Sequence, residues 1–220
     1  MIYSNHIAAL NELSASEGVF TTAQAARLGI TRNALSQAVT SGRAERIAHG
    51  AYRLAGSQGD FTDELAAVWK LTNPAAFTHE RIEVGAWDGI AIGGSTAACL
   101  QNLGDFYLSP YRIYAPRRIN SRMKSASFAI RRVDPDDVSW IKGLPVTRPE
   151  RTLVDLCLDN EEWSLVEDSF NSAGNLDYDR LVKIIADQSE RKSVQESLSV
   201  IRGLMERHLD MERASRAAVR

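Results

Sequence analysis

The sequence of 220 residues predicts an α+β fold in two domains. The first 55 residues contain short helical patterns, separated by single glycines, that end in an alternating strand pattern. The later residues combine alternating strand patterns with several apolar helix patterns. Residues 55–60 are polar, contain two glycines and separate the two regions. We therefore expect a small domain over residues 1–56 and a larger mixed α/β domain, a small sheet surrounded by helices, over residues 61–220.

The small domain is predicted to contain three helices and a hairpin. Thr21 and Gln24 have the spacing of a capping box, in which each side chain bonds a free amide at a helix start. Gly29 ends that helix, Thr31 caps the next one, and a glycine turn joins the two hairpin strands. The expected helices are 6–13, 22–28 and 32–40, residues 18–20 are an extended link, and the hairpin strands are 46–48 and 51–54. This order of elements is typical of a winged helix-turn-helix.

In such a domain the second helix of the helix-turn-helix can enter the major groove of DNA. Arginine can hydrogen-bond guanine there, and asparagine or glutamine can bond adenine. Basic residues near the hairpin can contact phosphates. The candidate DNA-binding residues are Thr22, Gln24, Arg32, Asn33, Ser36, Gln37, Arg43, Arg46, His49 and Arg53. The alternative is a small helical domain whose polar face only contacts water.

The larger domain is predicted to be mixed. Its strands are 111–115 and 126–133, which we expect to pair, and a short extended piece at 144–146. Pro149 occupies a favourable first-turn position of one helix, and Ser95 is expected to cap another. Arg151 and Asp155, four residues apart on a helix, are expected to form an ion pair. The expected helices are 61–72, 78–87, 96–103, 148–158, 161–170, 177–187 and 193–209.

The net charge of −2 conceals an uneven distribution. Residues 134–220 carry 12 basic and 18 acidic residues, whereas residues 106–133 carry seven basic residues and no acid. A basic surface of this kind can bind DNA or an acidic protein partner. The alternative is a solvated strand edge that charge protects from aggregation. The seven candidate residues are Arg112, Arg117, Arg118, Arg122, Lys124, Arg131 and Arg132.

Composition excludes several classes of protein. The apolar runs are far shorter than the ~20 residues of a membrane helix. The first residues contain no basic lead followed by an apolar run, so we expect no secretory signal. Cys99 and Cys157 are too few for a disulfide framework or a zinc site, and we expect both in the core. We therefore expect a cytoplasmic protein without metal or cofactor and without contact to a membrane.

Enzyme motifs are incomplete in this sequence. Gly93-Gly94-Ser95 followed by Asp105 resembles a nucleotidyltransferase motif, but such a site needs a second carboxylate at position 107, where Tyr107 stands. We find no acidic cluster with a strand lysine, as a nuclease would need, and no Gly-x-Ser-x-Gly. The sequence therefore predicts no enzyme.

Two blocks of sequence resemble the AbiEi family of antitoxins, which belongs to the abortive-infection, type IV toxin–antitoxin class. The first comprises Val19–Arg32, Gly42-Arg43 and Arg46–Leu54, and the second is Gly143-Leu-Pro-Val-Thr-Arg-Pro-Glu-Arg-Thr-Leu-Val-Asp155. Ser95-Thr-Ala-Ala98 also matches a helix start of that family. The resemblance implies an autorepressor that binds inverted repeats in double-stranded DNA and neutralises a nucleotidyltransferase toxin. Two alternatives stay open: a winged-helix regulator whose second domain senses a small ligand, and a nuclease targeted by the winged helix.

Overall fold

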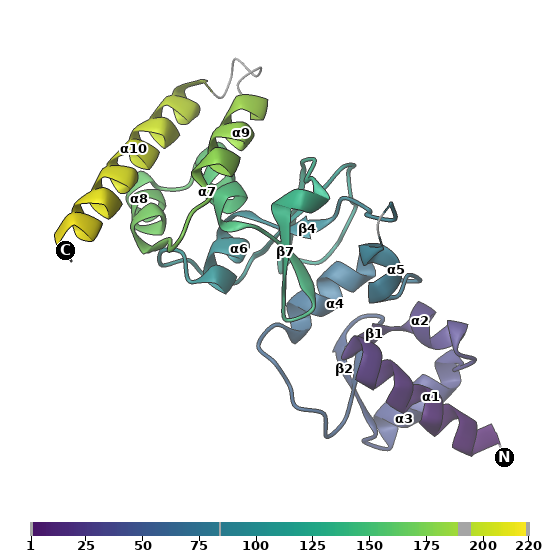
Figure 1. Cartoon of the computed structure of the whole chain (residues 1–220). Coiled ribbons are helices and arrows are strands. Elements are labelled where there is room, and N and C mark those ends of the chain that lie inside the picture. The colour runs from purple at the N-terminus through teal and green to yellow at the C-terminus, as the bar shows by residue number, and fades with distance from the viewer. Residues whose placement is uncertain (1, 84, 189–194, 219–220) are drawn as a thin grey trace. The chain divides into compact units, whose positions relative to one another are not determined.

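The computed structural model describes residues 2–83, 85–188 and 195–218, and it has the predicted α+β architecture (Figure 1). The chain forms two compact units. The first unit contains residues 1–90 and 142–144, and the second contains residues 91–141 and 145–220. The first unit thus extends well beyond the boundary expected at residues 56–61.

The first unit contains the winged helix-turn-helix, in which helices surround a small antiparallel sheet of strand order β1-β3-β2. The predicted link 18–20 contributes a third strand, because Phe20 pairs with Tyr52 across the sheet. The first helix is longer than predicted, and the helix expected at 78–87 ends at Ile82. The elements are α1 (Ile2–Glu17), β1 (Val19–Thr21), α2 (Thr22–Arg27), α3 (Arg32–Thr40), β2 (Ala44–Ala48), β3 (Ala51–Leu54), α4 (Asp63–Leu71) and α5 (Thr78–Ile82).

Local sequence signals fix the helix-turn-helix. The capping box is confirmed, because the Gln24 amide donates to Thr21 Oγ1 at 3.1 Å and the Thr21 amide donates to Gln24 Oε1 at 2.8 Å. Gly29 has a φ of 78°, which suits glycine, and it ends the turn before α3. A compact core lies beneath these helices, with Leu13, Phe20, Ala25, Ile30 and Leu35 all buried.

A buried ion pair ties α1 to the helices that follow the hairpin. The Glu17 carboxylate accepts hydrogen bonds from the Lys70 ammonium and from the hydroxyl and amide of Thr78. Nearby, Arg81 stacks on Trp69 at 3.7 Å from the ring centroid and donates to Asp88 at 2.7 Å. These contacts make α4 and α5 part of the first unit.

The second unit contains a five-stranded sheet of order β6-β5-β4-β8-β7. Strands β5 and β6 pair as predicted, in parallel, and β5 is antiparallel to β4. Two strands were not predicted, β4 (Ala91–Ile92) and β7 (Val138–Ile141), and the predicted strand 126–133 ends at Ile130. The other strands are β5 (Tyr111–Ala115), β6 (Ala126–Ile130) and β8 (Leu144–Thr147).

Helices of the second unit enclose a second core, which includes Leu153, Phe170 and Ile184. Cys157 lies in this core as expected, and burial raises the pKa of its thiol to about 12, whereas Cys99 is only partly buried. The helices are α6 (Gly94–Gln101), α7 (Pro149–Leu158), α8 (Trp163–Ser172), α9 (Tyr178–Gln188) and α10 (Gln195–Ala218). Residues 193–194 of the predicted helix 193–209 lie outside the described residues.

The ion pair leads to a stability prediction, Glu17→Gln. This change leaves the Lys70 ammonium buried without its counter-charge, and we expect it to lower the free energy of unfolding by about 3–5 kcal/mol. Urea titration of both proteins at neutral pH measures the difference. Glu12→Gln, the same change at an exposed position of α1, is the matched control and should leave stability unchanged.

The same variant has a defined pH dependence. Burial raises the pKa of Glu17, but the Lys70 charge and the hydrogen bonds from Lys70 and Thr78 outweigh it and hold the pKa below its ordinary value of 4.5. The stability that Glu17 contributes is therefore present above about pH 4.5 and is lost as the pH falls through its lowered folded-state pKa. The stability difference between wild type and Glu17→Gln should shrink in this range. A difference that is independent of pH would contradict the account.

Candidate nucleic-acid interface

Helix α3 presents one polar face to solvent and one apolar face to the core. Leu35 and Ala38 are buried. Thr31 caps the helix, since its hydroxyl accepts the Ala34 amide at 3.2 Å. The exposed residues of the polar face are Arg32, Asn33, Ser36, Gln37 and Thr40. Four of them, Arg32, Asn33, Ser36 and Gln37, are candidate DNA-binding residues from the sequence.

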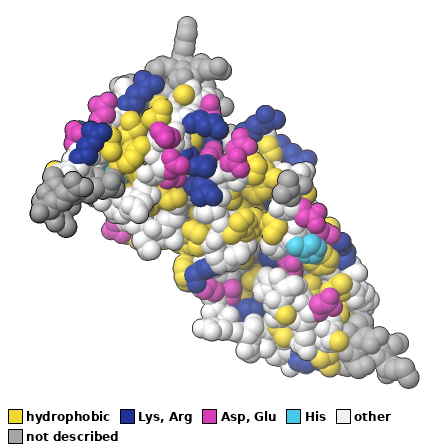
Figure 2. All heavy atoms as spheres, in the orientation of Figure 1, with side chains coloured by type: hydrophobic (Ala, Val, Ile, Leu, Met, Phe, Trp, Pro, Cys, Tyr) yellow, Lys and Arg dark blue, Asp and Glu magenta, His cyan; other side chains and the backbone are white. Residues whose placement is uncertain are grey.

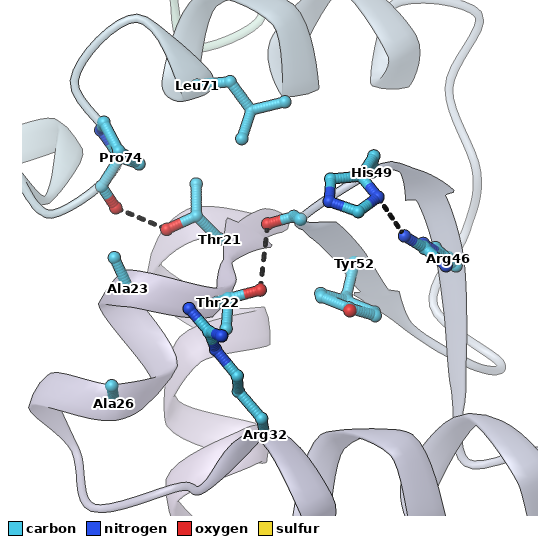
Figure 3. A pocket seen from close by; sticks show the side chains of 11 residues that line it. Thr21, Thr22, Ala23, Ala26, Arg32, Arg46, His49, Tyr52, Leu71 and Pro74 are labelled. Atoms are coloured by element: carbon cyan, nitrogen blue, oxygen red, sulfur yellow. Dashed lines mark hydrogen bonds between the residues drawn. The ribbon is translucent and has the colours of Figure 1, made fainter.

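An open pocket of about 660 Å³ lies between α2, the start of α3 and the hairpin (Figure 3). Arg32 and Thr22 lie on one side of it, and Arg46 and His49 lie on the other. Its remaining walls come from Thr21, Ala23, Ala26, Gly50, Tyr52, Leu71 and Pro74. The pocket therefore has a basic rim over an apolar floor.

Hydrogen bonds fix the position of the hairpin turn against the helix-turn-helix. The Gly50 carbonyl accepts the Thr22 amide at 2.9 Å and the Thr22 hydroxyl at 3.4 Å (Figure 3). Arg46 Nη2 lies 2.6 Å from His49 Nδ1, so these two side chains form one polar group on the hairpin. Gly50 has a φ of 87°, which a side chain would strain at this turn. The hairpin thus holds Arg46 and His49 at a fixed place relative to α2.

Two candidate residues already have bonding partners within the protein. Gln24 is completely buried, and its amide donates to the Ala76 carbonyl at 2.7 Å. Arg53 is held by Glu45 at 2.6 Å and by Asp63 at 2.5 Å. The expectation for Gln24 is corrected by its burial, whereas Arg53 is partly exposed and is neutralised by its two carboxylate partners. Arg43 is half-buried and donates to the Ser41 hydroxyl at 2.9 Å.

The seven basic residues of segment 106–133 divide into two groups. Arg112 and Arg131 are partly buried and pair with carboxylates of α7 and its end. Arg112 contacts Asp159 at 2.9 Å, and Arg131 contacts both Asp155 at 3.0 Å and Asp159 at 2.8 Å. Arg112 and Arg131 were expected in an exposed basic patch, but they are partly buried and held by carboxylates of the fold. The exposed group comprises Arg117, Arg118, Arg122, Lys124 and Arg132.

The internal charge cluster is structural. Arg151 pairs with Asp155 at 2.9 Å, which confirms the predicted i,i+4 pair, and Tyr114 donates to Asp159 at 2.8 Å. Burial raises the pKa of Asp155 despite its arginine neighbours. At Asp159, hydrogen bonds from Arg112 and Tyr114 and the charge of Arg131 outweigh the burial and lower the pKa. On the face shown in Figure 2, basic and acidic side chains likewise lie close together at several places.

The segment Gly93-Gly94-Ser95 opens helix α6 directly beside this cluster. Gly93 is the cap residue of α6, so the expected cap role of Ser95 is wrong. A Cβ on Gly93 would lie 1.9 Å from the Tyr114 ring, which explains a glycine at this position.

Within the described residues, no group of three or more His, Cys, Asp or Glu side chains could hold a metal ion. Among the same residues, no helix has both the length and the apolar character needed to cross a membrane.

The comparisons with known proteins agree with this architecture. Residues 8–55 match a family described as "Transcriptional regulator, AbiEi antitoxin", which confirms the resemblance for that segment. No curated protein matches the chain. Among solved structures, the chain is similar to the crystal structure of the Rv2827c protein from Mycobacterium tuberculosis, with a TM-score of 0.57 and 15% sequence identity. The match covers 93% of this chain and 77% of that chain, and at this identity it shows a shared fold.

Proposed function

We propose that this chain, whose residues 8–55 match the AbiEi transcriptional regulators, binds an inverted-repeat operator in double-stranded DNA and represses its own operon. The observation that carries the proposal is the polar, exposed face of α3 in a winged helix-turn-helix. Asn33 and Gln37 lie four residues apart on this face, so both side chains can enter one groove. Asparagine and glutamine can each make two hydrogen bonds to adenine.

The pocket beside α3 supports a second part of this proposal. Arg32, Arg46 and His49 surround it with hydrogen-bond donors, which is the chemistry that a DNA phosphate requires. Phosphate contacts fix the position of the protein on DNA but do not distinguish sequences. We therefore assign base contacts to Asn33 and Gln37, and phosphate contacts to Arg46 and His49. Ser36, Thr22 and Arg43 are assigned to the edge of the same interface.

We further propose that the protein acts as antitoxin to a nucleotidyltransferase toxin in the cytoplasm and has no catalytic activity of its own. The family description of residues 8–55 supports the antitoxin role. Co-expression with a nucleotidyltransferase toxin, taken from a neighbouring reading frame where one encodes it, tests this role directly. Growth that the toxin arrests and this chain restores is the expected result, whereas growth arrest in both cases would contradict it.

The division of roles predicts different binding defects. Asn33→Ala or Gln37→Ala should lose about 1–3 kcal/mol of discrimination between operator and scrambled duplex, because base contacts carry the specificity. Arg46→Ala should weaken binding to both duplexes by similar factors. Titration of each variant with both duplexes measures the difference. Equal losses on both duplexes for Asn33→Ala and Gln37→Ala would exclude α3 as the base-contacting helix.

A stability control belongs to this series. Leu35 is 1% exposed on the inner face of α3, so Leu35→Ala should lower the free energy of unfolding by about 2–5 kcal/mol. Asn33→Ala and Gln37→Ala alter exposed side chains and should leave the thermal midpoint unchanged. A lowered midpoint in these two variants would show that their binding defects arise from unfolding.

The ion pairs of the hairpin predict the salt dependence. Each phosphate that a cation neutralises adds about 0.9 to the slope of log affinity against log salt concentration. Arg46→Ala should therefore reduce this slope by about one. Arg53→Gln should leave it unchanged, because Glu45 and Asp63 already neutralise Arg53. A slope that depends on Arg53 and not on Arg46 would reverse the assignment.

A further inference from the structure

We infer that the outer edge of strand β6 binds an extended acidic segment of a partner protein, which adds to the sheet as a further β-strand. The surface concerned comprises this strand edge and the five exposed cations Arg117, Arg118, Arg122, Lys124 and Arg132, and is called the basic edge below. The inference does not depend on DNA binding by the first unit.

The first observation is the open main chain of β6. This strand ends the five-stranded sheet, and no described strand pairs with its outer side. The Ser125 carbonyl accepts the Tyr111 amide at 2.7 Å, and the Arg131 amide donates to the Ala115 carbonyl at 2.9 Å. Main-chain bonding alternates along a strand, so residues 125, 127, 129 and 131 bond to β5. The amides and carbonyls of Phe128 and Ile130 therefore point to the open side.

The second observation is a hollow of about 440 Å³ that is lined by β6 and by the connecting segment 117–122. Four residues of β6 line the hollow, Ala126, Phe128, Ala129 and Ile130, and three of them, Ala126, Phe128 and Ile130, share one face because side chains alternate along a strand. Ser127 lies on the opposite face, where it accepts a hydrogen bond from Arg112. Ile130 is 68% exposed. An added strand with apolar side chains at every second position would cover this apolar floor.

The third observation is the charge around the hollow. Arg117, Arg118 and Arg122 line it, and Lys124 and Arg132 flank the two ends of β6. Within the part of the chain that the structure describes, none of these five forms an ion pair, in contrast to Arg112 and Arg131. The sequence from residue 106 to residue 133 contains no acid. The occupant that complements this rim is acidic.

Charge and chemistry favour an acidic strand over two other occupants of the basic edge, a second copy of β6 and single-stranded nucleic acid. Symmetric pairing of two β6 edges would bring five cations against five cations, which like-charge repulsion opposes. Single-stranded nucleic acid uses successive aromatic side chains for stacking, whereas Phe128 is the one aromatic side chain among the described residues that line the hollow. An acidic strand satisfies the rim, the floor and the open main chain together.

Synthetic peptides test the proposal on the full-length chain by amide NMR spectroscopy. An eight-residue peptide that alternates Glu and Val should shift the amide signals of Phe128 and Ile130 and slow their exchange with water. A peptide that alternates Glu and Pro carries the same charge but lacks every second main-chain donor, and it should bind much more weakly. A peptide that alternates Lys and Val should not bind.

Charge reversal tests the cation requirement. Arg117→Glu with Arg118→Glu should weaken binding of the Glu-Val peptide about tenfold or more. Lys183→Glu with Arg202→Glu makes the same change in charge at exposed positions of α9 and α10, and should leave affinity within about twofold. Binding of the operator should be unaffected by the peptide, so failure of the proposed DNA function and failure of this inference are separable.

Three results would overturn the inference. Equal affinity for the Glu-Val and Glu-Pro peptides would show that the surface attracts charge without adding a strand. Tighter binding of a twelve-nucleotide oligothymidylate at the same amides would assign the surface to nucleic acid. No binding of the Glu-Val peptide at millimolar concentration would show that the basic edge is a solvated strand edge.

Discussion

The buried carboxylate of Glu17 holds the first unit together. It lies at the end of α1, one residue before the glycine that leads into β1, and it bonds Lys70 of α4 and Thr78 of α5. Burying these charges is costly unless both partners and their hydrogen bonds are present. The position of the helix-turn-helix therefore depends on contacts with α4 and α5. The hydrogen bonds to the Gly50 carbonyl then hold the hairpin residues Arg46 and His49 beside α3.

In both units, cations that pair with carboxylates stabilise the fold, whereas exposed cations lie on the surfaces for which we propose binding. Arg53 in the first unit and Arg112 and Arg131 in the second lie against carboxylates, which neutralise them within the fold. Arg32 and Arg46 are exposed beside the pocket of the first unit. Since the net charge of the whole chain is only −2, these local groups, and not the total charge, determine which surfaces attract an anionic partner.

Local sequence signals made much of the first unit predictable, whereas contacts between residues far apart in the sequence could be seen only in the structure. The capping box of Thr21 and Gln24 and the two faces of α3 follow from residues within one or two helical turns. The side chain of Gln24 looked available for DNA but is buried, and its amide donates to Glu17 at the end of α1 and to Ala76 in the loop between α4 and α5. Strand β4 contains two residues, too few for an alternating pattern. Arg112 looked like a surface cation because its partner, Asp159, follows 47 residues later in the sequence.

The central claim is that the exposed face of α3 determines which DNA sequence the protein binds. Selection from a library of random duplexes, followed by sequencing, tests this claim for an operator of any sequence. We expect the wild-type chain to enrich an inverted repeat, and Asn33→Ala to enrich the same repeat with lost preference at one or two positions in each half. An unchanged motif for Asn33→Ala and for Gln37→Ala, or no enriched motif with the wild-type chain, would contradict the claim.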